Sequence, residues 1–284
     1  MREKTHSISD VALAVAACGA ALSVMAAFAW IVGDVALHGW ARISPAFLTT
    51  PPSDAGRAGG IAPVLMSTAW ILAVCMGVSL PIALGAAVLL SEQSAETRRF
   101  AGFVRRSLDV LAGMPSIVFG LFGNAFFCVF LGMGFSILSG GLTLACMVLP
   151  ILIRTAEEGL RGVPRDYRLS SAALGMTRYT TLVRILLPAA APGLIVGLML
   201  GIGRALAETA ALIFTSGYVD RMPRSLLDSG RALSIHIYDL AMNVAGGEPN
   251  AYATALVLVA LLLVINGAAS WITDHTLRAG ARAT

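Results

Sequence analysis

The stretch that decides the fold is RDYRLSSAALGMTRYTTLVRILLPAAAPG, from Arg165 to Gly193. Pro164, just before it, can begin a helix because the missing N–H of proline costs nothing in the first turn. Gly175 can end that helix in the left-handed conformation, and Thr177 can cap a second helix that we expect to stop before Pro188. The stretch therefore predicts a compact, arginine-rich loop that a partner protein grips. Two helices lying on anionic headgroups fit the same spacing.

The chain around this loop is strongly apolar. Of its 284 residues, 57% are apolar and 13% are charged, whereas soluble domains are about half apolar and about a quarter charged. The apolar residues form long blocks, each near the ~20 residues that a helix needs to cross the hydrocarbon of a bilayer. We therefore expect an all-α, polytopic membrane protein with six transmembrane helices, at residues 11–33, 61–90, 108–131, 137–154, 189–214 and 251–272.

Basic residues give the expected orientation. Of the 20 lysines and arginines, 14 fall on one side of the six spans, 5 fall on the other, and Arg204 lies within a span. Because Lys and Arg are retained on the cytoplasmic side, we expect both termini and residues 155–188 to be cytoplasmic. The first apolar run, about 20 residues long, exceeds the core of a secretory signal, so we expect it to be retained. Residues 225–242 on the outer side are either an interfacial helix or an ordered loop that caps the bundle.

The polar residues exclude several classes of function. The only lysine is Lys4, so the chain has no Walker A lysine to bind ATP. The cysteines and histidines lack the spacing of a disulfide framework or a metal site, and no clustered basic domain indicates nucleic-acid binding. Glu157 and Glu158 lie beside Arg154 and Arg161, which is typical of a solvated, charge-balanced helix end. We expect no catalytic residue, no metal site and no cofactor bound by this chain.

The third span contains residues that break helices. Gly113 and Pro115 free backbone carbonyls that need partners, and such backbone is tolerated at membrane depth only against protein or a wet cavity. We therefore expect this segment to face inward, with Ser116 and Asn124 as candidates for lining a path. A kink packed against a neighbouring helix is the alternative.

The fifth span combines small residues with charge. Gly193, Gly197 and Gly201 are spaced by four, which lets helix backbones touch. Arg204 and Glu208 fall on the same stripe, within an arc of roughly 80°, so the pair should face protein. An arginine at the bilayer centre costs about 2.5–3.5 kcal/mol on insertion scales. Two interpretations stay open: an ion pair that locks helices, and an arginine that contacts an anion or gates a path.

These patterns match a known family. Gly175, followed after nine residues by Ile185-x-Leu187-Pro188, resembles the EAA loop of the permeases of binding-protein-dependent ABC importers. More closely, over about residues 50–272 the chain resembles the PstA-type phosphate permeases. The stretches that carry this closer resemblance are TTPPSDAGRAGG before the second span, Pro115-Ser-Ile-Val-Phe-Gly120, Leu149-Pro-Ile-Leu-Ile-Arg-Thr-Ala-Glu-Glu158 and, most specifically, Arg204-x-x-x-Glu208-Thr209-Ala210.

The resemblance implies a fold, a function and partners. The fold is the type I ABC importer permease fold, with an N-terminal transmembrane helix and periplasmic loop in residues 1–60. A permease core follows in residues 61–275, with a cytoplasmic coupling loop at 155–188. The function is the transmembrane permease subunit of an ATP-driven importer of inorganic phosphate in the bacterial inner membrane. The partners are a homologous second permease, a dimer of ATPase subunits that bind ATP and Mg, a periplasmic phosphate-binding protein and membrane lipid. The alternatives are a permease for another oxyanion or a phosphonate, and a motor-independent transporter.

The resemblance also assigns roles to residues. Those expected along the substrate path are Arg204, Glu208, Ser116 and Asn124, with Glu208 holding Arg204 in the empty state. Those expected to couple the chain to the ATPase are Arg168, Leu169, Gly175, Ile185 and Pro188. The chain departs from the family pattern at Leu169, where a glutamate is usual, at Ser170 and Ser171, where alanines are usual, and at Ala211, where a proline is usual.

Overall fold

The computed structural model describes residues 8–92 and 98–281. The basic residues Arg2, Lys4 and Arg282, which contribute to the expected orientation, lie outside these ranges. The described α-helices are α1 (Ile8–Gly39), α2 (Pro45–Thr49), α3 (Ala62–Ser91), α4 (Arg98–Ala112), α5 (Ser116–Gly123), α6 (Ile137–Gly162), α7 (Arg165–Ala173), α8 (Arg178–Thr181), α9 (Leu187–Leu206), α10 (Ala210–Ile213), α11 (Leu233–Met242) and α12 (Glu248–Ala281). Two π-helical segments, η3 (Asn124–Phe130) and η4 (Leu182–Leu186), two short 3₁₀ turns, η1 (Trp40–Arg42) and η2 (Asp54–Gly56), and the antiparallel pair β1 (Pro52–Ser53) and β2 (Ala58–Gly59) complete the list.

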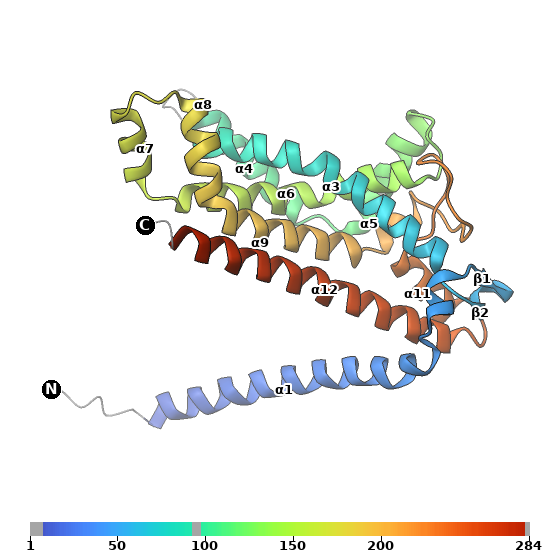
Figure 1. Cartoon of the computed structure of the whole chain (residues 1–284). Helices are drawn as coiled ribbons and strands as arrows, with labels where there is room; N and C mark the ends of the chain where they lie inside the picture. The colour runs from blue at the N-terminus through green and yellow to red at the C-terminus, as the bar shows by residue number, and fades with distance from the viewer. Residues whose placement is uncertain (1–7, 93–97, 282–284) are drawn as a thin grey trace.

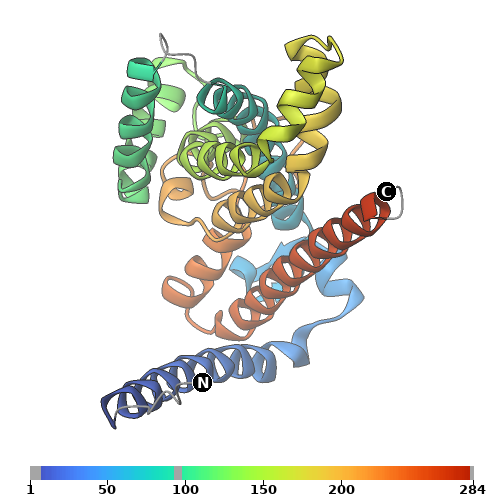
Figure 2. The same ribbon diagram turned by 90° about the vertical axis from the view of Figure 1, so that its left-hand side faces the viewer.

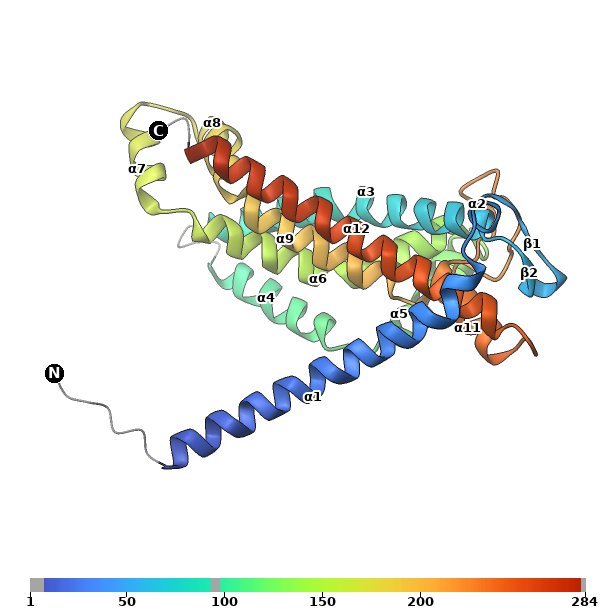
Figure 3. The same ribbon diagram turned by 60° about the horizontal axis from the view of Figure 1, so that its bottom comes forward.

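The long helices form a bundle with two different ends (Figure 1). Helices α3, α6, α9 and α12 run alongside one another, with α7 and α8 at one end and α11 and the β1–β2 hairpin at the other. Helix α1 leaves the bundle near the hairpin and diverges from it, as Figures 2 and 3 also show. None of the most apolar part of α1 is buried within this chain. Its surface is therefore available to lipid or to another subunit.

The fold is all-α and polytopic, as the composition predicts. Five described helices are long and apolar enough to cross a membrane, at Ala12–Arg42, Ala62–Ser91, Ile137–Gly162, Arg178–Leu206 and Glu248–Trp271. A sixth crossing exists if the pair Arg99–Ala112 and Ser116–Phe130, bent by 100°, is one broken span.

The third span is broken where its sequence predicts a break. Helix α4 ends at Ala112, and α5 begins at Ser116 directly after Pro115. The predicted boundary at residue 108 is wrong, because residues 108–112 belong to α4. That helix mixes arginines with apolar residues, and Phe100 and Phe103 are exposed on its surface.

The fourth span is longer than predicted. The predicted span ends at residue 154, whereas α6 continues to Gly162. Its last turns carry Arg154, Glu157 and Arg161, each of which has an oppositely charged partner. The expectation of a solvated helix end is wrong for Glu157, whose side chain is only 8% exposed.

The fifth span differs from the prediction at both ends. The expected stop before Pro188 is wrong, since α8, η4 and α9 form one helix from Arg178 to Leu206. A proline ring clashes with the carbonyl four residues before it. The π-helical η4 relieves this clash by widening the turn, and the Leu187 N–H accordingly bonds to the carbonyl of Leu182. The helix then ends at Leu206, well short of the predicted residue 214.

Close packing between α6 and α9 confirms the glycine stripe. A Cβ added to Gly193 would lie 2.9 Å from the Cα of Gly159, and one added to Gly201 would lie 2.8 Å from a methyl of Leu152. One added to Gly197 would overlap Thr155. Only glycine lets the two backbones approach this closely.

The segment 225–242 caps the bundle. Within α11, Leu233, Ile235 and Leu240 are fully buried. The Leu233 N–H donates to the Thr68 hydroxyl of α3 over 2.9 Å. These contacts favour the ordered cap over the interfacial helix.

Candidate functional site

The first candidate site is the end of α9, where Arg204 and Glu208 form an ion pair. Arg204 Nη2 lies 3.6 Å from Glu208 Oε2. The side chain of Arg204 is 52% exposed in this chain, whereas that of Glu208 is 5% exposed. The arginine therefore presents its guanidinium to the surroundings while the carboxylate is held inside.

Glu208 is held by the backbone as well as by Arg204. The N–H of Ala211, in the first turn of α10, donates to Glu208 Oε1 over 3.2 Å. The hydroxyl of Ser234, from α11, donates to the carbonyl of Glu208 over 2.6 Å. The two carboxylate oxygens thus have separate partners, and Glu208 would keep its place if Arg204 moved away.

This geometry corrects the prediction that both residues lie on the glycine stripe. The buried continuation of that stripe is Ala205, one turn beyond Gly201. Arg204 lies at its edge, and Glu208 lies beyond the last helical residue, Leu206. Glu208 is therefore buried in protein as predicted, whereas the side chain of Arg204 is half-exposed.

The two weaker path candidates occupy different places. The Asn124 carboxamide donates through Nδ2 to the carbonyl of Phe214 over 2.8 Å. This bond ties the start of η3 to the residue that follows α10, so Asn124 has a structural role close to the Glu208 region. Ser116 is the first residue of α5, is half-buried, and lies directly after the break in the third span.

The second candidate site is the loop that carries α7 and α8. Helix α7 ends in a Schellman motif: the Gly175 N–H bonds to the Ala172 carbonyl over 3.0 Å, and the Met176 N–H bonds to the Ser171 carbonyl over 3.0 Å. Gly175 has a φ of +70°, a conformation that glycine adopts without cost. Thr177 then caps α8 by accepting a hydrogen bond from the Thr180 N–H over 3.2 Å. The two helices joined at a glycine are as predicted.

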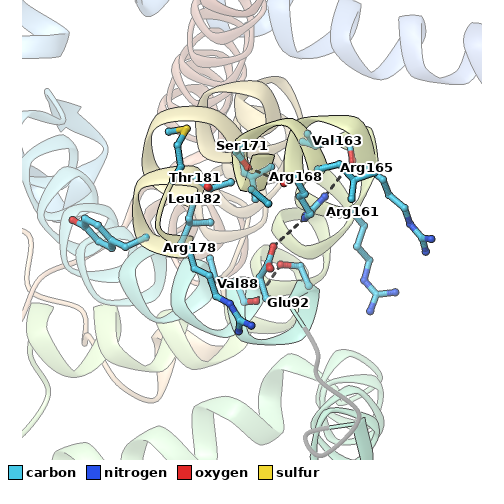
Figure 4. A pocket seen from close by; sticks show the side chains of 16 residues that line it. Val88, Glu92, Arg161, Val163, Arg165, Arg168, Ser171, Arg178, Thr181 and Leu182 are labelled. Atoms are coloured by element: carbon cyan, nitrogen blue, oxygen red, sulfur yellow. Dashed lines mark hydrogen bonds and ion pairs between the residues drawn. The ribbon is translucent and has the colours of Figure 1, made fainter. Parts of the chain in front are cut away.

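Arg168 anchors this loop to the bundle. Its Nε donates to Glu92 Oε1 over 3.2 Å, and its Nη2 donates to the carbonyl of Leu160 over 3.2 Å. Figure 4 shows Arg168 extending from α7 toward Glu92 at the end of α3. The side chains around them enclose a groove of about 1120 Å³, which Arg161, Arg165 and Arg178 also line.

The other predicted coupling residues lie on the same loop. Leu169 is 67% exposed and lines the groove. Ile185 is half-buried in η4, and Pro188 is exposed in the first turn of α9. The structure thus gathers all five predicted coupling residues at one end of the bundle, while the path candidates lie on α5, η3 and the end of α9.

Sequence reasoning missed an ionic cluster at the base of this loop. Glu157 Oε1 accepts hydrogen bonds from Arg105 Nε and Nη2, at 3.0 and 2.8 Å, and lies 3.0 Å from Arg161 Nε. The spacing of four between Glu157 and Arg161 was a visible signal for one pair. Arg105 is 52 residues away in sequence, so no local pattern could identify it.

No group of three or more His, Cys, Asp or Glu side chains able to hold a metal ion occurs among residues 8–92 and 98–281. The four cysteines are free thiols. The structure therefore provides a half-exposed guanidinium, a broken span and an arginine-lined groove at the loop of α7 and α8.

Two solved structures share the fold. The first is the MetNI methionine ABC transporter in inward-facing conformations, at a TM-score of 0.61 and 18% identity, covering 75% of this chain and 94% of that one. The second is a bacterial ABC transporter involved in the import of the acidic polysaccharide alginate, at a TM-score of 0.61 and 14% identity, covering 94% and 98%.

Sequence comparison identifies the family. Residues 79–278 match the model of the binding-protein-dependent transport system inner membrane component, and the chain belongs to this family. It is 33% identical over 255 residues to the probable ABC transporter permease protein YqgI of Bacillus subtilis strain 168, covering 84% of this chain and 86% of that one. It is 35% identical over 217 residues to the phosphate transport system permease protein PstA 1 of Mycobacterium tuberculosis strain H37Rv, covering 76% and 70%. It is 30% identical over 225 residues to PstA of Xylella fastidiosa strain 9a5c, covering 77% and 75%.

The family settles two general points. The chain is a multi-pass membrane permease subunit of an ABC importer and not a catalytic enzyme. Permeases of this type work with an ATPase and a second permease.

Proposed function

We propose that this chain is the permease subunit of an ATP-driven importer that carries inorganic phosphate across the bacterial inner membrane. Its relatives named as phosphate permeases support the choice of phosphate. The observation that carries the proposal is the half-exposed guanidinium of Arg204 beside a buried, separately held carboxylate.

Phosphate chemistry fits this arrangement. A phosphate dianion needs positive charge and hydrogen-bond donors, and the planar guanidinium of arginine supplies both in a fork. In the empty state, Glu208 Oε2 balances the charge of Arg204 at 3.6 Å. When the anion arrives, Arg204 turns to it, and Glu208 stays in place because Ala211 and Ser234 still hold it. Ser116 and Asn124 are proposed to line the path nearby.

The loop of α7 and α8 is proposed to receive the motion of the ATPase. Helix α6 runs into this loop at Gly162, and α8 continues through η4 into α9. A movement of the loop therefore moves both helices that contact each other along the glycine stripe. The end of α9 carries Arg204, so the same movement can open the site to each side in turn. Arg168, Leu169, Gly175, Ile185 and Pro188 are proposed as the coupling residues.

The proposed assembly contains this chain, a homologous second permease, two ATPase subunits that bind ATP and Mg, and a periplasmic phosphate-binding protein. Both termini and the α7–α8 loop are proposed to be cytoplasmic, because the 14-to-5 distribution of basic residues in the sequence favours that side. The hairpin and α11 then face the periplasm.

Uptake of labelled phosphate tests the proposed function. The chain is expressed with its neighbouring transporter genes in a strain that lacks its own phosphate importers, and sulfate and a phosphonate are added as competitors. Uptake should require this chain and ATP, and only unlabelled phosphate should compete. Competition by sulfate or the phosphonate, with no response to phosphate, would contradict the choice of substrate while leaving the transporter class intact.

A further inference from the structure

The cluster around Glu157 joins three helices at one point. Arg105 comes from α4, Glu157 and Arg161 come from α6, and both arginines also donate to the carbonyl of Leu90 in the last turn of α3, at 3.1 and 3.2 Å. Among the residues that the structure describes, the charge contacts of this carboxylate converge on a single oxygen, Oε1. Removing Glu157 would break the contact of Arg105 with α6 at this point without removing either arginine, while the ion pair between Arg154 of α6 and Asp109 of α4 would remain.

The cluster lies next to the loop of α7 and α8, which we call the docking loop because it is proposed to dock the ATPase. Arg168 of α7 bonds to the carbonyl of Leu160, one residue before Arg161, and to Glu92, two residues after Leu90. A displacement of α7 therefore acts on the same ends of α3 and α6 that hold Glu157 and its partners.

The cluster is also continuous with the broken span. Arg105 lies on α4, which ends at the break before Pro115, and α5 then turns away by 100°. Beyond α5, Asn124 is bonded to the carbonyl of Phe214 after α10, and Glu208 holds the first turn of α10. A shift of α4 can therefore reach the Arg204 site through α5, because only residues 113–115 link the two helices and a displaced α4 must pull on the start of α5.

We infer that Glu157 is a positioning residue for coupling: it fastens α4 to the base of the docking loop, so that movement of α7 is passed to the broken span and the anion path. This inference rests on the proposed function, in which an ATPase moves α7. A buried carboxylate with two arginines suits the role because a charge-assisted, forked contact is strong and directional. Neutral packing at the same point would hold the helices together but would allow them to slide.

The test compares Glu157→Gln with Glu158→Gln in the complete transporter, reconstituted in liposomes. Glu158 is the next residue on α6 and is exposed, so it is a matched control of the same chemistry. Three quantities are measured: the amount of ATPase that co-purifies, the ATP hydrolysed, and the substrate transported. Glu157→Gln should leave ATPase recruitment and ATP hydrolysis within about twofold of wild type, and should lower transport at least tenfold. The ATP consumed per substrate molecule should therefore rise at least fivefold, whereas Glu158→Gln should leave it unchanged.

Folding is preserved for a structural reason. In Glu157→Gln, the side chains of Arg105 and Arg161, 34% and 49% exposed, can reach water and keep their bonds to Leu90. Arg105→Lys is a second variant that keeps the charge but loses the fork, since an ammonium group cannot reach both Glu157 and the Leu90 carbonyl in the same way. It should raise the ATP consumed per transported molecule to an intermediate value.

Two outcomes would overturn the inference. One is a Glu157→Gln transporter whose ATP hydrolysis and transport fall in the same proportion, which is the result of a merely structural role. The other is a ratio equal to that of Glu158→Gln. A wild-type transporter that moves another anion instead of phosphate contradicts only the proposed substrate, because the ratio can be measured with whichever substrate is carried.

Discussion

Arg204 and Glu208 differ in how tightly the structure holds them, and this difference leads to a test. Glu208 has a buried side chain with two further anchors, whereas Arg204 is half-exposed. Glu208→Gln leaves the guanidinium of Arg204 without its counter-charge and should therefore lower the yield of assembled complex. Arg204→Gln should assemble normally, with ATPase recruitment intact, and should reduce phosphate uptake at least tenfold.

The double variant Arg204→Gln with Glu208→Gln separates the two interpretations of the pair. If the pair only locks helices, the neutral variant should recover uptake, since a neutral pair leaves no uncompensated charge. If Arg204 contacts the anion, uptake should stay lost while the complex remains intact. Wild-type uptake in the double variant would contradict the role of Arg204 in the path.

His236 predicts a pH dependence of stability. It is 1% exposed in α11, and its Nδ1 lies 3.4 Å from Nη1 of Arg231, which also pairs with Asp239 at 3.1 Å and with Asp220 at 3.9 Å. Burial first, and then the charge of Arg231, lower the pKa of His236 from 6.5 to about 4, although the two aspartates act in the opposite direction.

The sign follows from proton binding. Between pH 6.5 and about 4, His236 binds a proton in the unfolded chain but not in the folded chain. Its contribution to the free energy of unfolding is therefore fully present above pH 6.5 and is lost as the pH falls toward 4. The loss is about 3 kcal/mol in all, and it should appear as a fall in the melting temperature of the purified protein as the pH drops. His236→Gln should flatten the melting temperature over this range. Equal slopes for variant and wild type would contradict the assignment.

At the scale of elements, Gly175 decides the shape of the docking loop. Its φ of +70° and its place in the Schellman motif require a left-handed residue, although the space around it is open. A β-branched residue is strongly disfavoured there, so Gly175→Val should rearrange α7 relative to α8 with little effect on membrane insertion. The ATPase should then no longer co-purify. Gly162→Val is the control, since Gly162 at the end of α6 also has open space but no positive φ; normal ATPase recruitment by Gly175→Val would contradict the docking role.

The glycine stripe gives a test of helix packing. Any Cβ at Gly197 would overlap Thr155 of α6, whereas one at Gly203, on the same helix, would have nothing within 4 Å. Gly197→Val should therefore destabilise the bundle by about 1–3 kcal/mol through overpacking, whereas Gly203→Val should cost nothing, since valine has a slightly better helix propensity than glycine. Thermal denaturation of the two purified variants checks this. Equal melting temperatures would show that α6 and α9 are not in close contact.

Elements with local signals could be predicted from the sequence, and those that depend on distant partners could not. The end of α7 could be predicted from Gly175, and the start of α8 from Thr177, because each residue type favours its position. The end of α9 at Leu206 is different, because no Gly or Pro follows it before α10. That turn is held instead by Ser234, 26 residues away from Glu208.

The same distinction explains the errors at Pro188 and Glu157. Proline usually stops a helix, but the wider π-helical turn of η4 avoids the clash at Pro188. No pattern in the local sequence predicts that π turn. The four-residue spacing of Glu157 and Arg161 is visible, whereas the burial of Glu157 depends on Arg105 and Leu90 from two other helices. The local sequence singled out Arg204, Glu208 and Asn124 as candidates, whereas the hydrogen bonds that hold Glu208 and Asn124 depend on the fold.

At the scale of the whole molecule, the two ends of the bundle differ in charge and in shape. The α7–α8 end carries the arginine-lined groove, and the other end carries the β1–β2 hairpin and the cap of α11. The 14-to-5 distribution of basic residues predicts that the α7–α8 end lies in the cytoplasm. If the bent pair counts as one span, the chain has six spans, and both of its ends should lie on that same side.

Cysteine labelling tests this orientation with exposed residues at opposite ends. Leu174, beside Gly175, is 78% exposed, and Met222, in the segment before α11, is 49% exposed. Each is changed to cysteine in a Cys18→Ser background, since Cys18 is the exposed native thiol among the four. A membrane-impermeant maleimide should label Met222→Cys in intact spheroplasts and should label Leu174→Cys only after the membrane is opened. Labelling of Leu174→Cys in intact spheroplasts would reverse the orientation. The loop of α7 and α8 would then lie on the side of the membrane that a cytoplasmic ATPase cannot reach. That one result would contradict the coupling roles of Arg168, Gly175 and Glu157.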